Sequence, residues 1–241
     1  MTHVESTKSP EDQAYLVATI RPWNIDAYHS TVKQFPGQWH LVSNPSELTL
    51  EYVRALAPRY IFFPHWSQIV PKEILELAEC VCFHETDLPY GRGGSPIQNL
   101  IKRGHRETQI TALKMVEEVD AGPVYMKRPL SLDGSAEQIF IRASNIVVQM
   151  IGDIAQRTPV PTPQQGTPTL FKRRTPKQSE LSMEFTTIEQ IYDHIRMLDA
   201  PEYPCAYLDA HGIRFVFKNA SLNRNTNELT ATVTIKLKEQ K

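Results

Sequence analysis

The chain has few of the residues and segments that mark the more specialised classes of protein. Three cysteines among 241 residues are too few for a disulfide framework, and reduced thiols are the rule in the cytoplasm. No stretch approaches 18 consecutive apolar residues, so no membrane-spanning helix is predicted. Residues 1–14 are polar and lack the apolar centre of a signal peptide. We therefore expect a cytoplasmic protein with no membrane partner.

Charge of one sign is not in excess either. The chain carries 26 Lys and Arg against 27 Asp and Glu, a net charge of −1 at pH 7. This balance argues against a disordered polyanion and against a protein that binds nucleic acid mainly through bulk charge. Hydrophobic residues make up 41% of the chain, which is enough for a sizeable core. The length suits one large domain with a smaller one.

Short apolar runs alternate with helical stretches through the first half of the chain. Strands are predicted at 15–20, 39–43, 60–63 and 79–83, and helices at 25–35, 44–56 and 71–77. The strands are almost continuously apolar, as strands are when both faces of their sheet are covered. This pattern predicts an α/β fold with a mostly parallel sheet and helices on both faces.

The second half continues this pattern and then changes character. Its predicted elements are a helix at 96–103, strands at 108–116 and 124–127, and a long helix at 136–156 with Ser135 as its N-cap. The segment that follows is rich in proline and poor in apolar residues, which predicts an extended, semi-rigid linker at 158–176. A helix at 188–198 and strands at 206–208, 213–217 and 228–237 predict a small α+β unit over 177–241.

The glycine-rich turn at 91–95 does not match the common nucleotide-binding or nucleophile motifs. The third glycine position of G-x-G-x-x-G is occupied by Pro96, and no P-loop sequence is present. Ser95 lacks the second glycine of G-x-S-x-G because position 97 is Ile. The turn therefore predicts neither a dinucleotide site nor a serine nucleophile.

Cys80, Cys82 and His84 alternate along one predicted strand and would point to the same face. Two thiolates and an imidazole could hold zinc with a fourth ligand from elsewhere. The C-x-C-x-H spacing on a buried strand is unlike common zinc sites, and free cysteines are among the most buried residues. We therefore favour two core thiols and a separate histidine, with no metal site.

His84 and Asp120 are the candidates for acid–base chemistry. His84 ends a predicted strand of the parallel sheet, and ligands bind outside the carboxyl ends of such strands. Asp120 precedes an Ala-Gly-Pro turn between two other predicted strands. Each alone is more often structural, but a carboxylate beside an imidazole could orient it or take a proton itself.

Residues 82–101 read CFHETDLPYGRGGSPIQNLI, and this stretch resembles the signature of formyltransferases that use N10-formyltetrahydrofolate. The family motif is Asn-x-His-x-Ser-x-Leu-Pro, followed by a glycine-rich turn, a Pro-initiated helix and later an x-Asp-x-Gly segment. Asp120 lies 36 positions after His84, in the expected form of that segment. The resemblance covers about 60–130 and implies a Rossmann-like catalytic domain over 1–157, with N10-formyltetrahydrofolate as cosubstrate.

The tail resembles the methionyl-tRNA and sugar branches of this family. The sequence FKRRTP at 171–176 is similar to their Arg-Arg-x-Pro segment, and IRMLDA at 195–200, followed by YPCA at 203–206, is similar to a later segment. The purine-pathway enzymes of the family lack such a tail. Relatives of this kind are often homodimers, and the tail is where a dimer contact would be sought.

The resemblance implies roles for individual residues. His84 would stabilise the developing oxyanion, and Asp120 would hold His84 and help to remove the proton of the amine. The folate pocket would be lined by Thr86, Asp87, Leu88 and Pro89. Apart from the resemblance, Trp23 and Asn24 lie in the predicted loop after the first strand, at a strand end from which they could contact the acceptor substrate.

One position departs from the family motif. Cys82 stands where the family has its catalytic Asn, and a thiol cannot replace an amide as the oxyanion donor. Either His84 suffices with a backbone N–H, or an amide arrives from Asn24, Gln98 or Asn99, or the chemistry is impaired.

The balanced charge leads us to expect a nucleotide-linked amino-deoxysugar as the formyl acceptor, with no nucleic-acid partner. Lys172, Arg173 and Arg174 form a local basic cluster, but such clusters are usually solvated or ion-paired. Two alternatives stay open. One is a methionyl-tRNA formyltransferase, and the other is a homologue that binds folate without catalysis.

Overall fold

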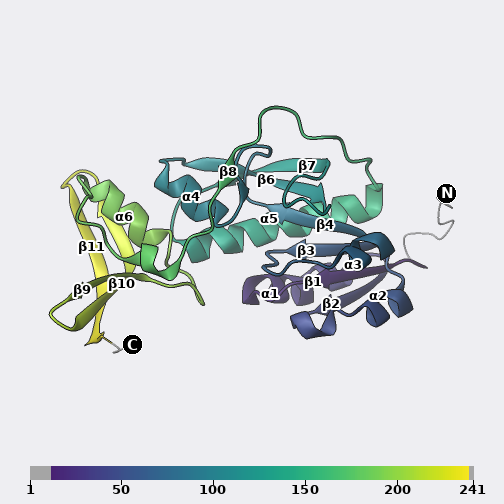
Figure 1. The fold of residues 1–241 in the computed structure, drawn as a ribbon, viewed down its shortest axis with the longest axis horizontal. Helices are drawn as coiled ribbons and strands as arrows, with labels where there is room; N and C mark the ends of the chain where they lie inside the picture. Colours follow the sequence, from purple (N-terminus) through teal and green to yellow (C-terminus); the bar gives the residue numbers. More distant parts are fainter. Residues whose placement is uncertain (1–11, 239–241) are drawn as a thin grey trace. The chain divides into compact units, whose positions relative to one another are not determined.

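The computed structural model of the chain describes residues 12–238, so the prediction for residues 1–14 lies mostly outside it. Within that range, two compact units form (Figure 1). The first comprises the chain up to Arg92 with Gln109–Pro129 and Ile141–Thr169, and the second comprises Gly93–Thr108, Leu130–Phe140 and the chain from Leu170 onward. The domain boundaries at 157 and 177 stay a prediction.

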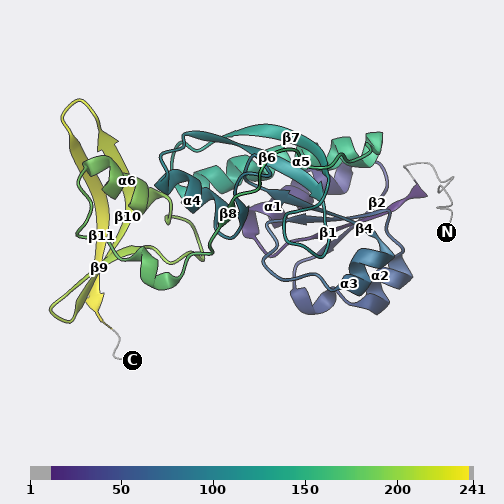
Figure 2. The same cartoon turned by 45° about the horizontal axis from the view of Figure 1, so that its top comes forward.

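A six-stranded sheet with the order β2-β1-β3-β4-β6-β7 dominates the described residues (Figures 1 and 2). Its strands are β1 (Ala14–Ala18), β2 (Gln38–Val42), β3 (Tyr60–Pro64), β4 (Glu79–His84), β6 (Glu107–Lys114) and β7 (Val124–Ser131). The strands β2, β1, β3 and β4 pair in parallel, whereas β4 and β6 pair antiparallel. The prediction of a mostly parallel sheet is confirmed. The reversal at β6 was not visible in the sequence, because a buried apolar run looks the same in either direction.

Side chains of the central strands alternate between two covered faces. Leu16 and Ile61 lie in a cluster with residues of α2 (Leu50–Leu56) and α3 (Lys72–Leu77). The opposite face is aromatic, with the ring of Tyr15 stacked on Trp39 at 4.5 Å between centroids. The hydroxyl of Tyr15 donates to the carbonyl of Ala155 in α5 (Ala136–Arg157), so this helix covers the aromatic face. The fold predicted from the continuous apolar runs therefore has its physical basis in burial on both faces.

Two predicted helices differ from the observed ones. The helix expected at 44–56 is a 3₁₀ turn, Pro45–Glu47, followed by α2, because Asn44 and Thr49 each accept a hydrogen bond from a backbone N–H and act as separate N-caps. The helix expected at 25–35 begins earlier, as α1 (Pro22–Ser30), and continues as a 3₁₀ turn at Val32–Gln34. The fixed φ of Pro22 suits the first position of a helix.

The second unit holds a three-stranded antiparallel sheet and short helices. The sheet has the order β11 (Glu228–Leu237), β10 (Ile213–Asn223), β9 (Ala206–Ala210), and α6 (Ile188–Arg196) packs on β10. The helix α4 (Pro96–Lys102), the short strands β5 (Arg92–Gly93) and β8 (Leu170–Phe171) and a 3₁₀ turn at Pro176–Ser179 are further elements that lie wholly or partly in this unit. No helix of the described chain is long and apolar enough to cross a membrane.

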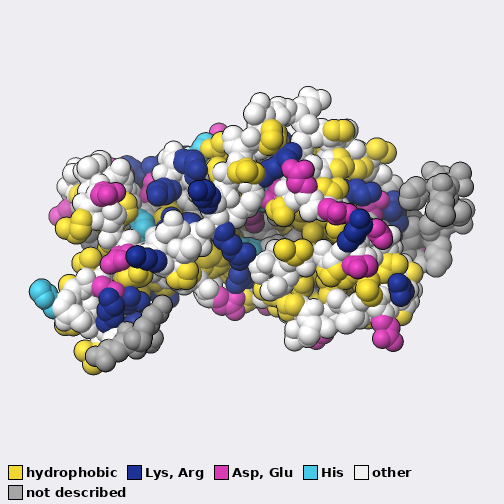
Figure 3. Space-filling model, in the orientation of Figure 1, with side chains coloured by type: hydrophobic (Ala, Val, Ile, Leu, Met, Phe, Trp, Pro, Cys, Tyr) yellow, Lys and Arg dark blue, Asp and Glu magenta, His cyan; other side chains and the backbone are white. Residues whose placement is uncertain are grey.

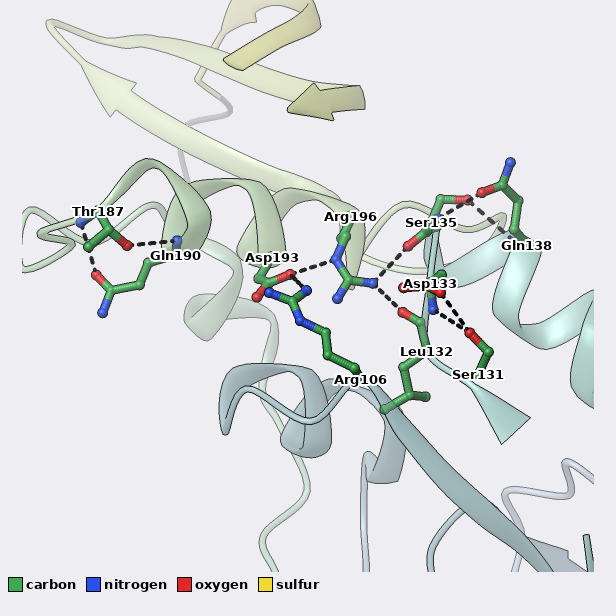
Figure 4. A network of polar contacts seen from close by, with 11 residues as sticks. Arg106, Ser131, Leu132, Asp133, Ser135, Gln138, Thr187, Gln190, Asp193 and Arg196 are labelled. Atoms are coloured by element: carbon green, nitrogen blue, oxygen red, sulfur yellow. Dashed lines mark hydrogen bonds and ion pairs between the residues drawn. The ribbon is translucent and has the colours of Figure 1, made fainter. Parts of the chain in front are cut away.

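A buried arginine ties α6 to the loop before α5 (Figure 4). Arg196 is 2% exposed, and its Nη1 donates to the carbonyl oxygens of Leu132 at 2.5 Å and Gly134 at 2.9 Å. Its Nε donates to Oδ1 of Asp193 at 2.6 Å, which supplies the countercharge. A buried guanidinium without such a carboxylate would be strongly unfavourable.

Substitution Asp193→Ala is expected to destabilise the protein by about 3–5 kcal/mol, because it leaves the Arg196 charge buried and unneutralised. Equilibrium unfolding in guanidinium chloride measures this change. The exposed Asp133, in the same region, provides the control, and Asp133→Ala should change the free energy of unfolding by no more than about 0.5 kcal/mol. Equal changes in the free energy of unfolding for the two substitutions would show that the buried pair contributes no more to stability than an exposed carboxylate does.

Candidate functional site

His84 is the last residue of β4, at the carboxyl end of a central strand. Its Nε2 lies 2.8 Å from the carbonyl oxygen of Gly91, and because a carbonyl only accepts, Nε2 carries a hydrogen. Nδ1 is therefore the ring nitrogen that remains for other contacts. It lies 3.6 Å from Oδ2 of Asp120, and the two side chains are only 8% and 13% exposed. The structure thus brings the two predicted acid–base residues together, with Nδ1 and Oδ2 facing each other.

Asp120 reaches this position because of the tight turn between β6 and β7. Its backbone is left-handed, with φ of 55°, a conformation that Asp tolerates better than most residues. A Cβ on Gly122 would lie 1.7 Å from the carbonyl oxygen of Lys114, so only glycine fits there. The N–H of Lys114 donates to the carbonyl of Pro123 at 2.9 Å and closes the turn.

Two further ionisable groups border the pair. Burial raises the pKa of Glu85, an effect that the His84 imidazole partly offsets. Burial, together with the negative charge of Asp120, raises the pKa of the Cys82 thiol well above its usual range. Cys82 therefore stays a neutral thiol, which is a poor nucleophile and a weak hydrogen-bond donor.

The turn of Thr86, Asp87, Leu88 and Pro89 follows His84 directly. Thr111 in β6 pins it, since its hydroxyl donates to the carbonyl of Thr86 at 2.7 Å. Lys127 donates to Oδ1 of Asp87 and to the carbonyl of Leu88, both at 2.5 Å. Among the described residues, the buried hydroxyl of Thr86 has no hydrogen-bond partner. A buried polar atom left in this state fits a site that takes a polar ligand.

Asn24 and Trp23, predicted to contact the acceptor substrate, lie in the first turn of α1. Both protons of the Asn24 amide are engaged, by the hydroxyl of Thr19 and the carbonyl of Pro64, each at 3.3 Å. Trp23 is 9% exposed, and its carbonyl accepts a hydrogen bond from Ser144. These contacts give both residues a structural role, and their contact with substrate stays a prediction.

Gln98 and Asn99, the other two amides considered in place of the family Asn, belong to α4 in the second unit. Gln98 Nε2 donates to the carbonyl of Met197 at 3.2 Å. Asn99 Nδ2 donates to main-chain carbonyls, those of Gly94, Ser95 and Lys172. Their amide groups hold the backbone of their own unit, so nothing favours either as the oxyanion donor.

Sequence reasoning missed Gln164, whose side chain contacts the backbone of the Asp120 turn and the guanidinium of Arg92. It lies in the proline-rich segment, where a single Gln carries no recognisable signal. Over residues 12–238, no group of three or more His, Cys, Asp or Glu side chains comes together in a way that could hold a metal ion.

Several known proteins with a similar sequence or structure are formyltransferases. A family model described as formyl transferase matches residues 32–139, and one described as methionyl-tRNA formyltransferase, C-terminal domain, matches 176–236. The solved structure of methionyl-tRNA formyltransferase from Clostridium thermocellum is 43% identical, with a TM-score of 0.89. The match covers 94% of this chain and 100% of that one.

Curated relatives carry the same name. The methionyl-tRNA formyltransferase of Bacillus cytotoxicus is 31% identical over 170 residues, which cover 67% of this chain and 54% of the relative. The chain spans about half the length of the curated relatives that it matches. A sugar N-formyltransferase from a Shewanella species shares the fold, with a TM-score of 0.62 over 95% of this chain and 99% of that one, but only 13% of its sequence.

The expectation of a nucleotide-linked amino sugar as the substrate is therefore wrong, and so is the view that nucleic acid is not a partner. The relatives of 29–43% identity are named for methionyl-tRNA. The error has a physical cause, because net charge averages over the whole chain. Contact with nucleic acid depends on local clusters of Lys and Arg, which a net charge of −1 does not exclude.

Proposed function

The chain belongs to the family of N10-formyltetrahydrofolate-dependent formyltransferases, and we propose that it transfers a formyl group from N10-formyltetrahydrofolate to the amine of methionyl-tRNA. The observation that carries this proposal is the buried pair of His84 and Asp120, with Nδ1 and Oδ2 3.6 Å apart at the carboxyl end of β4. The names of the relatives support methionyl-tRNA as the acceptor. A cytoplasmic location, as expected from the sequence, is part of the proposal.

The turn of residues 86–89 would hold the formyl donor. Its main chain is fixed by Thr111 and Lys127, and the unpartnered hydroxyl of Thr86 is free to bond to a polar edge of the bound folate. When bound, N10-formyltetrahydrofolate supplies an electrophilic formyl carbon on a nitrogen leaving group. The residues of the turn therefore orient the donor beside His84, the last residue of β4, which directly precedes this part of the chain.

The chemistry that remains for the protein is proton transfer and charge stabilisation. As the amine nitrogen bonds to the formyl carbon, Oδ2 of Asp120 accepts the proton that the amine loses, since the carboxylate is buried beside the imidazole. When the bond between the formyl carbon and N10 breaks, Asp120 passes this proton to N10 of the departing tetrahydrofolate. His84, beside this carboxylate, stabilises the negative charge that develops on the formyl oxygen. The Nε2 bond to Gly91 keeps the ring in this orientation. Cys82, a neutral thiol, does not take over the role of the family Asn.

Four exposed cations in the second unit support a nucleic-acid substrate. Arg103 lies over the ring of Phe171 at 4.4 Å, and Asn99 donates to the carbonyl of Lys172, so α4 and the 171–173 segment lie side by side. Together they present Lys102, Arg103, Lys172 and Arg173, none of which forms an ion pair with a carboxylate within residues 12–238. Figure 3 shows Lys and Arg side chains gathered over the part of the molecule that carries α4. We call these four residues the basic cluster.

The double substitution Lys172→Gln and Arg173→Gln is expected to raise the KM for methionyl-tRNA by about tenfold or more, with little change in kcat, because it removes phosphate-binding groups and not reacting groups. The dependence of log kcat/KM on log salt concentration should become shallower by about 0.7–0.9 for each phosphate that the variant no longer neutralises. Lys72→Gln is the matched control, since Lys72 already pairs with Glu117 at 2.5 Å. An unchanged salt dependence in the double variant would contradict a role of the basic cluster in tRNA binding.

The proposed activity itself is tested by incubating the protein with N10-formyltetrahydrofolate and methionyl-tRNA charged on initiator tRNA. Formyl-methionyl-tRNA is separated and identified by mass. Its formation at a rate that depends on both substrates is the expected result. Binding of the folate without any formyl transfer to methionyl-tRNA would overturn the proposal and leave the protein a non-catalytic homologue.

A further inference from the structure

Residues 158–169, which their prolines predict to be part of a linker, are hydrogen-bonded to both loops of the candidate site within the first unit. Thr162 exchanges two backbone hydrogen bonds with Val124, at 2.7 and 2.9 Å, just after the turn that carries Asp120. Thr169 accepts the N–H of Gly91 on its hydroxyl at 2.7 Å and the N–H of Arg92 on its carbonyl at 2.9 Å. We call residues 158–169 the strap.

Gln164 is the central contact of the strap. Its Nε2 donates to the carbonyl oxygens of Asp120 at 2.7 Å and Gly122 at 2.9 Å. Its Oε1 accepts from Nε of Arg92 at 3.2 Å and from Nη2 at 2.9 Å. An amide group has two donor protons and two acceptor lone pairs, so all four hydrogen-bonding positions of Gln164 are used.

These contacts lie on both sides of the imidazole, with two to backbone carbonyls of the Asp120 turn and two from the guanidinium of Arg92. On one side is the left-handed Asp120, whose carboxylate faces Nδ1 of His84. On the other side, Arg92 follows Gly91, whose carbonyl accepts from Nε2 of the same ring. One side-chain amide therefore connects the two loops between which the imidazole is held.

We propose that Gln164 is a positioning residue that holds the Asp120 carboxylate at Nδ1 of His84. The inference rests on the proposed function for its catalytic consequence, but its structural part concerns only the ring and the carboxylate. A displacement of about 1 Å in a reacting group can lower a rate by about 100-fold. Removal of the two hydrogen bonds to the Asp120 turn would allow such a displacement, since the left-handed backbone of Asp120 is not a conformation that it adopts by preference.

The test compares Gln164→Ala and Gln164→Glu with Gln165→Ala. Glu at position 164 can still accept from Arg92 but cannot donate to the Asp120 turn, so it separates the two halves of the contact. Gln165, the exposed neighbour in the strap, is the matched control. Both variants at 164 should lower kcat by about 10- to 100-fold with little change in the KM for N10-formyltetrahydrofolate, and Gln165→Ala should leave both values unchanged.

A second measurement needs no substrate. The ring ¹⁵N signals of His84 are recorded in the labelled wild-type protein and in the Gln164→Ala and Asp120→Asn variants. If Gln164 acts through Asp120, its substitution moves the His84 signals toward those of the Asp120→Asn protein. This readout stays informative if the protein formylates a different amine, so failure of the proposed function and failure of the positioning role are distinguishable.

A double-mutant cycle completes the test. Gln164→Ala should lower kcat far less in the Asp120→Asn background than in the wild type, because the carboxylate that it positions is already absent. Equal reductions in the two backgrounds would assign Gln164 a general structural role and overturn the proposal. His84 signals that do not respond to Gln164→Ala, whether or not they respond to Asp120→Asn, would overturn it as well.

Discussion

Asp120→Asn is expected to lower kcat for formyl transfer by about 10²–10⁴-fold, the usual cost of losing a general base. Asn has nearly the same size and also tolerates a left-handed backbone, so the turn at φ of 55° is retained. Its amide cannot accept the proton of the attacking amine, and it no longer presents a negative charge to Nδ1 of His84 at 3.6 Å. Steady-state kinetics with N10-formyltetrahydrofolate and methionyl-tRNA measure the decrease.

The control lies in the same turn. Glu118 is an exposed carboxylate that pairs with Arg92 at 3.1 Å and does not face His84. Glu118→Gln should therefore leave kcat within about twofold of the wild type, since surface pairs of this kind contribute little. Melting temperatures of both variants should stay close to that of the wild type. Near-normal turnover of Asp120→Asn would remove Asp120 from the mechanism.

Substitution of His84 is expected to have an effect of similar size, and two replacements separate its two nitrogens. The amide nitrogen of Gln can take the place of Nε2 and still donate to the carbonyl of Gly91. Neither His84→Gln nor His84→Asn carries an imidazole nitrogen at the place of Nδ1, which faces Asp120. Both should lower kcat by at least about 100-fold, while His84→Gln should keep the melting temperature of the wild type.

The turnover of His84→Gln provides the sharper readout, because this variant keeps a donor for the Gly91 carbonyl and lacks the nitrogen that faces Asp120. If His84→Gln retained high turnover, Nε2 would be the group that matters. The ring would then serve only to hold the loop at Gly91.

The family motif gave the candidate pair without any structure. The order and spacing of the histidine, the Thr-Asp-Leu-Pro run and the later Asp-Ala-Gly-Pro segment are written in the chain, and their meaning came from the resemblance to the family. The alternating strands and helices followed from backbone preferences and the burial of apolar side chains. Helix capping is also a local preference, so the sequence was sufficient to predict two N-caps, Asn44 and Thr49, and hence two separate helical segments.

The acceptor substrate, in contrast, was predicted wrongly from the sequence. We inferred it from net charge, a sum over 241 residues in which position does not enter. Lys102 and Arg103 lie some 70 positions before Lys172 and Arg173, and only the packing of α4 against Phe171 makes them neighbours. Charges add to a local potential through space and not along the chain, so the basic cluster became visible only in the fold.

By itself, then, the sequence determined the fold class and the family and made His84 and Asp120 the candidates for the site, because each depends on short stretches of neighbouring residues. Only the tertiary structure decided which nitrogen of His84 faces Asp120, since the Gly91 carbonyl that occupies Nε2 reaches it across a turn. The tertiary structure also showed that the strap is hydrogen-bonded to the candidate site. The four hydrogen bonds of Gln164 join residues that are more than 40 positions apart in the sequence. Hydrogen bonds between distant segments form only in the folded chain, so no local sequence pattern predicts them.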